Sequence, residues 1–240
     1  IGLLPLYALN EVGYKRIIEL SSMSFLNDNQ LLEPQVDFKE LLTNNDGIAI
    51  FSGTILGLFG ELFNKGKFQN INELYSKLKS SYGDRFYIEI QRHEDENELG
   101  FEKFNLSKSL ELEIPLIATN EVFYLNKDMH EAHDALICIK NKTYVNEKNR
   151  LRFTNQHYFK NDSEMEELFA DLPEALENNY NFPFRCSFKP LFSKPILPNI
   201  SSEKGGNADE ILKKDSFDGL NEKFNKIFKV ENQDFSTNEK

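Results

Sequence analysis

Apolar runs and segments of helical period alternate along the first 120 residues. Four short apolar segments predict strands, and they cover residues 3–10, 46–53, 85–93 and 114–120. Between them, four longer segments predict helices, and they cover residues 11–26, 55–66, 71–83 and 100–113. Strands that alternate with helices in this way predict an α/β fold, with helices packed outside a parallel sheet or barrel.

Two of the predicted helices have recognisable apolar faces. The helix over 71–83 has apolar residues at i, i+3, i+4 and i+7, namely Ile71, Leu74, Tyr75 and Leu78. The helix over 11–26 places three apolar residues on roughly one face, with Met23 near them: Val12, Ile17 and Leu20. These faces are expected to pack against the sheet.

Beyond Leu136 the pattern becomes mainly helical. Two pairs have the spacing of a capping box, Ser163 with Glu166 and Asp171 with Glu174, and Pro173 falls in a first helical turn. A stretch rich in Pro, Ser and Gly predicts a linker over 188–207. A last helix is expected from about Ala208 to Phe228, with an apolar face formed by Leu220, Phe224, Ile227 and Phe228.

Composition narrows the class of protein. The chain has 240 residues, 40% of them hydrophobic, which is enough for one domain or one and a half. Acidic residues outnumber basic ones by 39 to 28, and this net charge of −11 argues against nucleic-acid binding by overall electrostatics. No apolar run is long enough to cross a membrane and no secretory signal opens the chain, so no membrane partner is expected. Cys138 and Cys186 have no metal-type spacing, and free thiols in a reducing cytoplasm are expected.

Two of the predicted strands end in polar clusters. Gln91, Arg92 and His93 end one strand, and Asn120 and Glu121 end the next. In parallel α/β folds, functional groups gather at the carboxyl ends of strands, so both clusters are expected at one rim. His93 can bind zinc or manganese there, and Glu121 can coordinate a cation or act as a base. The alternative is that His93 is only hydrogen-bonded and Glu121 only solvated.

Other motifs are absent or incomplete. His130 and His133 lie three residues apart in HEAH, one residue short of the zinc-protease motif H-E-x-x-H. We therefore expect a helix start near Asp128, with His133 packed or hydrogen-bonded below the rim. No G-x-S-x-G, P-loop or G-x-G-x-x-G motif is present. The residues by themselves thus indicate an α/β protein with one candidate site.

Several collinear segments add a resemblance. They are LYALNEVGYKRIIELSSMSFL, GIAIFSG, RFYIEIQRH, IPLIATNEVFYLNKDMHEAHDALICI, RLRFTNQHYFKNDSEMEELFADLPEALENN and PILPNI. In that order they resemble the alpha subunits of bacterial replicative DNA polymerase III, in the polymerase-and-histidinol-phosphatase (PHP) domain and the segment after it. The resemblance implies a distorted (β/α)7 PHP-type barrel lacking its first strands, followed by a mainly helical segment.

The resemblance also implies an organisation and a set of metal ligands. Residues 1–187 would be a partial PHP domain with its following helices, and 208–240 the start of the palm-side polymerase region and a tail. The H-x-H ligands of the family would precede Ile1. Within the chain, the E-I-Q-x-H motif matches residues 89–93, so His93 is a possible metal ligand that the chain retains. A second motif, Asp-x-His, is matched by Glu121 and Phe123. Phe123 offers no donor, so the metal site is expected to be a relic.

The function implied is that of a silent scaffold within a DNA-directed DNA polymerase. Regions outside the chain would carry out Mg²⁺-dependent primer extension and would contact primed DNA and the other replisome subunits. The chain itself would hold no catalytic residue and no cofactor. The proofreading exonuclease subunit would dock on the barrel's outer surface. The alternative is a metal-dependent PHP phosphoesterase or 3′→5′ exonuclease that uses His93 and Glu121.

Overall fold

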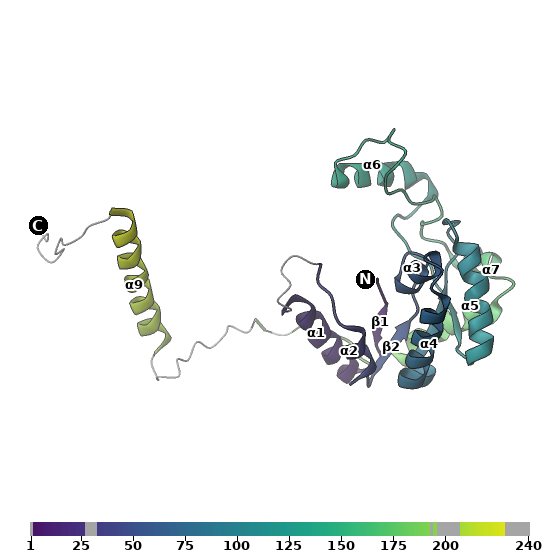
Figure 1. Ribbon diagram of the computed structural model, residues 1–240, viewed down its shortest axis with the longest axis horizontal. Coiled ribbons are helices and arrows are strands. Elements are labelled where there is room, and N and C mark those ends of the chain that lie inside the picture. The colour runs from purple at the N-terminus through teal and green to yellow at the C-terminus, as the bar shows by residue number, and fades with distance from the viewer. Residues whose placement is uncertain (1, 27–32, 193, 196–206, 229–240) are drawn as a thin grey trace, which may run out of the picture. The chain divides into compact units, whose positions relative to one another are not determined.

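The computed structural model describes residues 2–26, 33–192, 194–195 and 207–228 of the chain (Figure 1). It divides into two compact units, residues 1–189 and residues 190–240. The first unit contains the sheet and helices α1 to α8, and the second contains helix α9, Ala208–Phe228. The bounds of α9 are those predicted from the sequence. Among the described residues no helix is long and apolar enough to cross a membrane.

A four-stranded sheet lies at the centre of the first unit. Its strands are β1 (Leu6–Ala8), β2 (Ile48–Phe51), β3 (Phe86–Ile90) and β4 (Leu116–Ala118), in the order β1-β2-β3-β4. All four lie within the predicted strand segments. β2, β3 and β4 are parallel, as expected from the alternation of strands and helices. This parallel part brings the carboxyl ends of β3 and β4 to the same edge.

The first strand departs from the predicted parallel arrangement. β1 runs antiparallel to β2, with Tyr7 opposite Ala49. The described residues of the connection between them contain two helical segments, and the connection returns the chain to the end where β1 finished. The Leu9 N–H therefore donates to the Gly47 carbonyl, 2.8 Å away. The sheet is therefore mixed, with one antiparallel and two parallel strand pairs.

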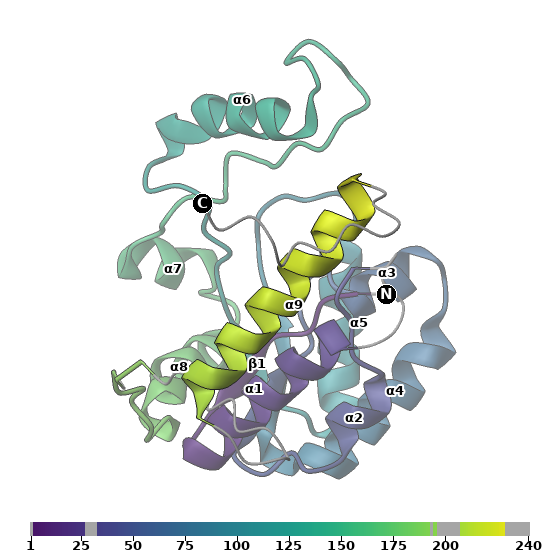
Figure 2. The same ribbon diagram turned by 90° about the vertical axis from the view of Figure 1, so that its left-hand side faces the viewer.

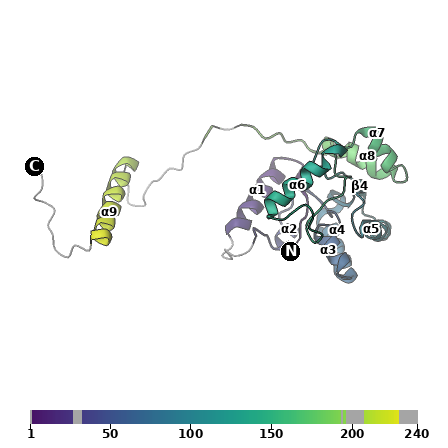
Figure 3. The same ribbon diagram turned by 90° about the horizontal axis from the view of Figure 1, so that it is seen from above.

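Helices cover the sheet at positions close to those predicted. The helices of this unit are α1 (Glu11–Leu26), α2 (Phe38–Leu42), α3 (Leu58–Asn64), α4 (Phe68–Tyr82), α5 (Glu98–Leu112), α6 (His130–Asn141), α7 (Asp162–Leu168) and α8 (Pro173–Asn181). Helix α8 packs against β4, as Figure 3 also shows. Helix α6 stands away from the sheet in two perpendicular views (Figures 1 and 2).

The sheet is apolar on both faces, as its continuous apolar strands predict. One cluster packs alternate strand residues against the helices, and it includes Ile48, Ile50, Phe59, Tyr75, Leu78, Phe86, Ile88 and Phe101. A second, smaller cluster on the opposite side consists of Leu9, Ala49, Phe51, Tyr87, Ile117 and Phe182. Ile71, Tyr75 and Leu78 are fully buried, which confirms the predicted face of α4.

Val12 and the capping pairs differ from the sequence predictions. Val12 is 61% exposed, because α1 buries Gly13 and Leu20 on a face to which Val12 does not belong. The capping box of α7 is formed by Asn161 and Glu164, two residues before the predicted pair. Neither Ser163 nor Glu166 takes part in it.

The predicted capping pair of α8 is also wrong. The N-cap position of α8 is held by Leu172, which makes no side-chain cap. The Asp171 carboxylate instead binds Arg92, because two guanidinium hydrogen bonds stabilise it more than a single backbone N–H does. Pro173 occupies the first helical position, as predicted.

In α9, Leu220 and Phe224 of the predicted apolar face are 50% and 44% exposed. The side chains of Ile227 and Phe228, residues 196–206 of the predicted linker and the tail from residue 229 lie outside the described residues.

Candidate metal centre

The two predicted polar clusters meet at one rim. β3 and β4 are in parallel register, with Ile90 opposite Ala118, so the residues that follow them leave the sheet side by side. Nε2 of His93 lies 3.0 Å from Oδ1 of Asn120, and the Glu121 N–H donates to the same nitrogen over 3.2 Å. His93 is 1% exposed, so this rim histidine is a buried group.

A second buried histidine completes the centre, and no motif in the sequence predicted it. His157 is fully buried, and its ring is stacked on His93 with ring centroids 4.0 Å apart and an interplanar angle of 2°. The loop that carries it is held to β4's continuation, because the Phe123 N–H donates to the His157 carbonyl. Thr154 also donates to the His93 carbonyl. Residue 157 lies in a segment without periodicity or motif, so only the fold brings it here.

Among the described residues, His93, Asp95 and His157 form a group that could hold a metal ion, with ligand atoms all within 4.8 Å of one another. Nε2 of His157 lies 3.5 Å from Asp95, and its Nδ1 lies 3.7 Å from Glu121. Nδ1 of His93 lies 3.7 Å from Glu98. Carboxylates therefore surround both stacked rings.

Within the described part of the chain, three nitrogens of these two rings are buried without a hydrogen-bond partner: Nδ1 of His93 and both ring nitrogens of His157. A buried polar atom without a partner typically costs about 1–3 kcal/mol. Two imidazoles with one carboxylate are a donor set that suits zinc, manganese or ferrous iron. The residues present therefore fit a metal ion, and coordination would give the unpaired nitrogens a partner.

Glu121, the other predicted ligand, lies at the border of this group. Its side chain is 39% exposed, and its carboxylate approaches His157 but is not one of the three clustered ligands. The carboxylate of the group is that of Asp95, which the sequence analysis did not single out. Asp95 follows β3 by only a few residues. It lies between Glu94 and Glu96, so the sequence did not distinguish it from its acidic neighbours.

Phe123 is part of an aromatic cluster at the rim. Its ring centroid lies 4.4 Å from that of Phe153, 5.0 Å from that of His157 and 5.3 Å from that of His133. The ring of His133 is stacked on Phe123, as expected for a packed histidine below the rim. Burial lowers the pKa of His133, and the neighbouring ring of His130 lowers it further. α6 begins at His130, close to the predicted start.

A buried lysine adjoins the centre. Lys160 is 8% exposed, and its ammonium donates to the Gln156 carbonyl and, over 3.2 Å, to Oδ1 of Asn120. It also lies over the Tyr158 ring, 4.6 Å from the centroid. Burial lowers the pKa of Lys160. Through Asn120, this ammonium is linked to His93.

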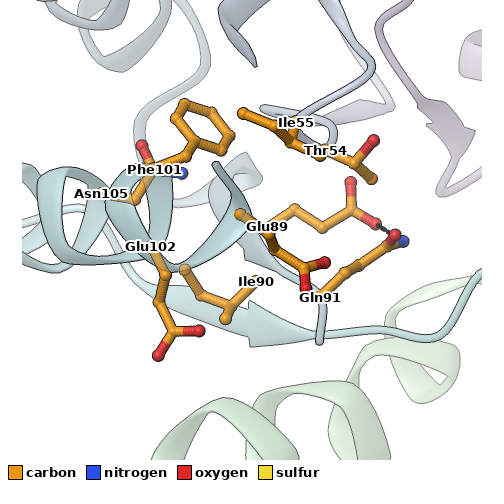
Figure 4. A pocket seen from close by; sticks show the side chains of 9 residues that line it. Thr54, Ile55, Glu89, Ile90, Gln91, Phe101, Glu102 and Asn105 are labelled. Carbon is orange, nitrogen blue, oxygen red and sulfur yellow. Dashed lines mark hydrogen bonds between the residues drawn. The ribbon is translucent and has the colours of Figure 1, made fainter. Parts of the chain in front are cut away.

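Glu89 is a second buried acid at the rim, 5% exposed. One carboxylate oxygen accepts hydrogen bonds from Thr119 and Gln91, and the other has no hydrogen-bond partner among the residues that the structure describes. Burial raises the pKa of Glu89, and nearby Glu121 raises it further. Figure 4 shows its bond to Gln91 beside a pocket of about 10 Å³. A cavity of about 320 Å³ lies on the side of Tyr7, Asn120 and Glu121.

Arg92 does not belong to the centre. Its guanidinium forms a double hydrogen bond with Glu102, at 3.0 and 2.6 Å, and another with Asp171, at 2.6 and 2.8 Å. It also donates to the Leu168 carbonyl and lies over the Phe169 ring, 4.8 Å from its centroid. Arg92 therefore fastens the end of β3 to α5 and to the turn between α7 and α8.

Comparison with known proteins supports the sequence resemblance. The family model of the PHP domain matches residues 2–93. DNA polymerase III subunit alpha of Caulobacter vibrioides is 36% identical over 217 residues, which are 90% of this chain and 19% of that protein. The chain is related to DNA polymerase III alpha subunits. The proteins of the same name from Rickettsia conorii and Vibrio cholerae are 36% and 30% identical, over 95% and 94% of this chain.

The resemblance to the DNA polymerase III alpha family is thereby confirmed over almost the whole chain. The PHP match ends at His93, so the candidate centre combines a residue of the matched segment with Asp95 and His157 beyond it. The chain spans 19% of the length of each of these three relatives.

Proposed function

We propose that the chain forms the PHP portion of the alpha subunit of a bacterial replicative DNA polymerase III. Its support is the similarity to proteins of that name over 90–95% of the chain. We further propose that Mg²⁺-dependent, DNA-templated nucleotide addition takes place in regions of the relatives that the chain does not match. Residues 208–240 would then lead toward the polymerase palm, and the protein would work in the cytoplasm.

Within that protein, the four-stranded sheet would form part of a distorted (β/α)7 PHP-type barrel. Three parallel strands with intervening helices are consistent with such a barrel. The outer edge of β1 would then adjoin the remaining strands.

The PHP portion would act as a scaffold without a catalytic metal cluster. The observation that carries this proposal is the Phe123 ring, which lies among the rings of His133, Phe153 and His157 where the family pattern asks for a nitrogen donor. Lys160 adds a fixed cation beside Asn120. The loss of a ligand weakens the binding of a metal ion, and the positive charge of the nearby Lys160 ammonium weakens it further.

A scaffold needs something to hold, and the proofreading exonuclease subunit is the proposed partner on the outer helical surface. Gel filtration of the chain mixed with that subunit at tens of micromolar tests this directly. Co-elution supports the proposal, and separate elution at that concentration contradicts it.

Metal binding and primer extension test the scaffold role. Titration calorimetry of the chain with Zn²⁺ and Mn²⁺ is expected to show no stoichiometric binding, and a primer-extension assay no product. Stoichiometric binding of either metal contradicts the scaffold proposal, and primer extension contradicts the assignment of synthesis to other regions.

The unpaired nitrogens of His93 and His157 favour a second candidate, a metal-dependent phosphoesterase or 3′→5′ exonuclease. His93, Asp95 and His157 would hold the ion, which when bound would polarise a phosphate and activate water. Glu121, half-exposed beside His157, would accept a proton. Mn²⁺-dependent nucleotide release that is lost in His93→Ala and kept in His130→Ala would establish this activity, and its absence in wild type rejects it.

A further inference from the structure

The end of α6 and the loop after it, residues 139–152, differ in charge from the rest of the chain. This basic loop contains five basic residues and one acidic residue, a net charge of +4. The other residues contain 23 basic and 38 acidic residues, a net charge of −15. The overall negative charge therefore conceals a local positive surface, which the sequence analysis did not detect.

The cations of the basic loop are available for binding. Lys140, Lys142 and Lys148 are exposed, and within the described part of the chain no carboxylate lies at ion-pair distance from them. The side chain of Arg152 is 61% exposed and only approaches Asp134, at 3.9 Å. Four cations thus lie on the surface of an element that projects from the sheet (Figure 2).

The acidic groups near the loop are already occupied. Glu147, its one acid, accepts a hydrogen bond of 2.9 Å from the Tyr144 backbone N–H. Asp134 on α6 accepts two hydrogen bonds from Arg150, at 2.5 and 2.6 Å, and both side chains are almost fully buried. Arg150 also donates to the Val145 and Leu151 carbonyls.

These contacts fix the shape of the loop. The buried bidentate pair ties Arg150 to Asp134 on α6, and Arg150 also binds the Val145 carbonyl earlier in the loop, so the exposed cations lie on a folded segment. Tyr144 is 74% exposed on the same loop. Exposed cations before and after an exposed aromatic residue in one loop are the combination that single-stranded nucleic-acid sites use, with ammonium groups on phosphates and the ring stacked on a base.

We propose that the basic loop binds the phosphate backbone of nucleic acid, preferably single-stranded, with Lys140, Lys142, Lys148 and Arg152 as phosphate contacts and Tyr144 as a stacking platform. We favour nucleic acid over an acidic protein surface as the partner because the loop also carries Tyr144. Its aromatic ring can stack on a base but forms no ion pair with a carboxylate. This binding involves neither the metal centre nor a polymerase site, and it stands if the proposed function fails.

Fluorescence anisotropy of a labelled 20-nucleotide oligo(dT) titrated with the whole chain measures the interaction. Binding is expected to weaken with salt, with a log–log slope of about −3 for four phosphate contacts to a single strand. A duplex of the same length is expected to bind more weakly than the single strand. No binding in low salt overturns the proposal, and so does a salt-independent affinity.

Charge reversal locates the site. The triple variant Lys140→Glu, Lys142→Glu, Lys148→Glu is expected to lose at least tenfold in affinity and most of the salt slope. The control, Lys67→Glu, Lys77→Glu and Lys103→Glu, changes the net charge equally. It reverses three exposed lysines elsewhere that form no ion pair with any described residue. Equal losses in both triples would show a general charge effect and overturn the proposal.

Tyr144→Ala separates stacking from charge. It is expected to weaken single-strand binding by about tenfold, since stacking contributes roughly 1–3 kcal/mol per base, while duplex binding changes little. All the substituted side chains are exposed, so each variant is expected to fold. Circular dichroism melts check this. Unchanged single-strand binding by folded Tyr144→Ala overturns the stacking role.

Discussion

The rings of His93 and His157 lie parallel with their centroids 4.0 Å apart, although one histidine follows strand β3 and the other comes from a distant loop. Stacking of this kind joins the loop around residue 157 to the sheet. It also places three ring nitrogens in the interior without hydrogen-bond partners. The stack is therefore both a structural joint and the centre of the candidate metal site.

The structural part of this double role predicts a large loss of stability on removal of His157. His157→Ala removes a fully buried ring that contacts His93, Phe123 and Phe153, and leaves a cavity among them. We expect the free energy of unfolding to fall by about 2–4 kcal/mol. Urea unfolding at neutral pH measures it. His130→Ala, a less buried ring, is the control and should lose less than about 1.5 kcal/mol. Equal losses would contradict the prediction.

Phe123 predicts a gain of metal binding by substitution. A histidine at this position would add a nitrogen beside His157, so Phe123→His is expected to bind Zn²⁺ or Mn²⁺ at least tenfold more tightly than wild type, for which no stoichiometric binding is expected. Titration calorimetry measures the change. Phe123→Leu removes the ring without adding a donor and should leave the affinity as in wild type. An affinity of Phe123→His equal to that of Phe123→Leu would refute a ligand position at residue 123.

Arg92 predicts an acid-sensitive contribution to stability. Hydrogen bonds from Arg92 lower the pKa of Asp171, so this pair stabilises the protein above the ordinary carboxyl pKa and the stability is lost as pH falls through the lowered pKa. Arg92→Met should cost about 2–4 kcal/mol at pH 7, mostly because Glu102 stays buried without a cation. It should also flatten the acid side of the stability profile.

Asp171→Asn is the matched control for Arg92→Met. The Asp171 side chain is 64% exposed, so its loss should cost less than about 1 kcal/mol. Urea unfolding between pH 3 and pH 7 measures both variants. If Asp171→Asn costs as much as Arg92→Met, Glu102 is not the dominant partner.

The strands and helices of the first unit follow from local patterns, and so does the rim. IAIF and IPLIA predict buried strands because both faces of the sheet are covered, and parallel register then brings His93 next to Asn120. What local patterns lack is information on long-range contacts. His157 reaches the centre through a loop that pairs with the chain after β4, and Asp171 is taken from its expected capping role by Arg92.

Net charge likewise carries no information on where the charges lie. The value of −11 is a sum over the whole chain and hides the basic loop. The one acid of this loop, Glu147, accepts a hydrogen bond from the Tyr144 backbone N–H. Only the structure separates exposed, unpaired cations from the buried Arg150.

Glu89 predicts the opposite pH dependence to that of the Arg92 pair. Burial raises its pKa and, among the described residues, no cation forms an ion pair with it, so folding favours the protonated carboxyl. Its contribution to stability is complete below the ordinary carboxyl pKa and is lost as pH rises through the raised pKa. Glu89→Gln keeps the shape without the charge. It should match wild type near pH 4 and be more stable at pH 8, as measured by urea unfolding.

Glu102→Gln is the contrasting substitution. Its carboxylate is equally buried but bound by Arg92, so the neutral amide leaves the guanidinium with a weaker partner. This variant should be less stable than wild type at pH 8, whereas Glu89→Gln is more stable. The difference depends only on whether the buried acid has a cation partner. A loss of stability in Glu89→Gln at pH 8 would mean that its charged form is stabilised by a group other than Thr119 and Gln91.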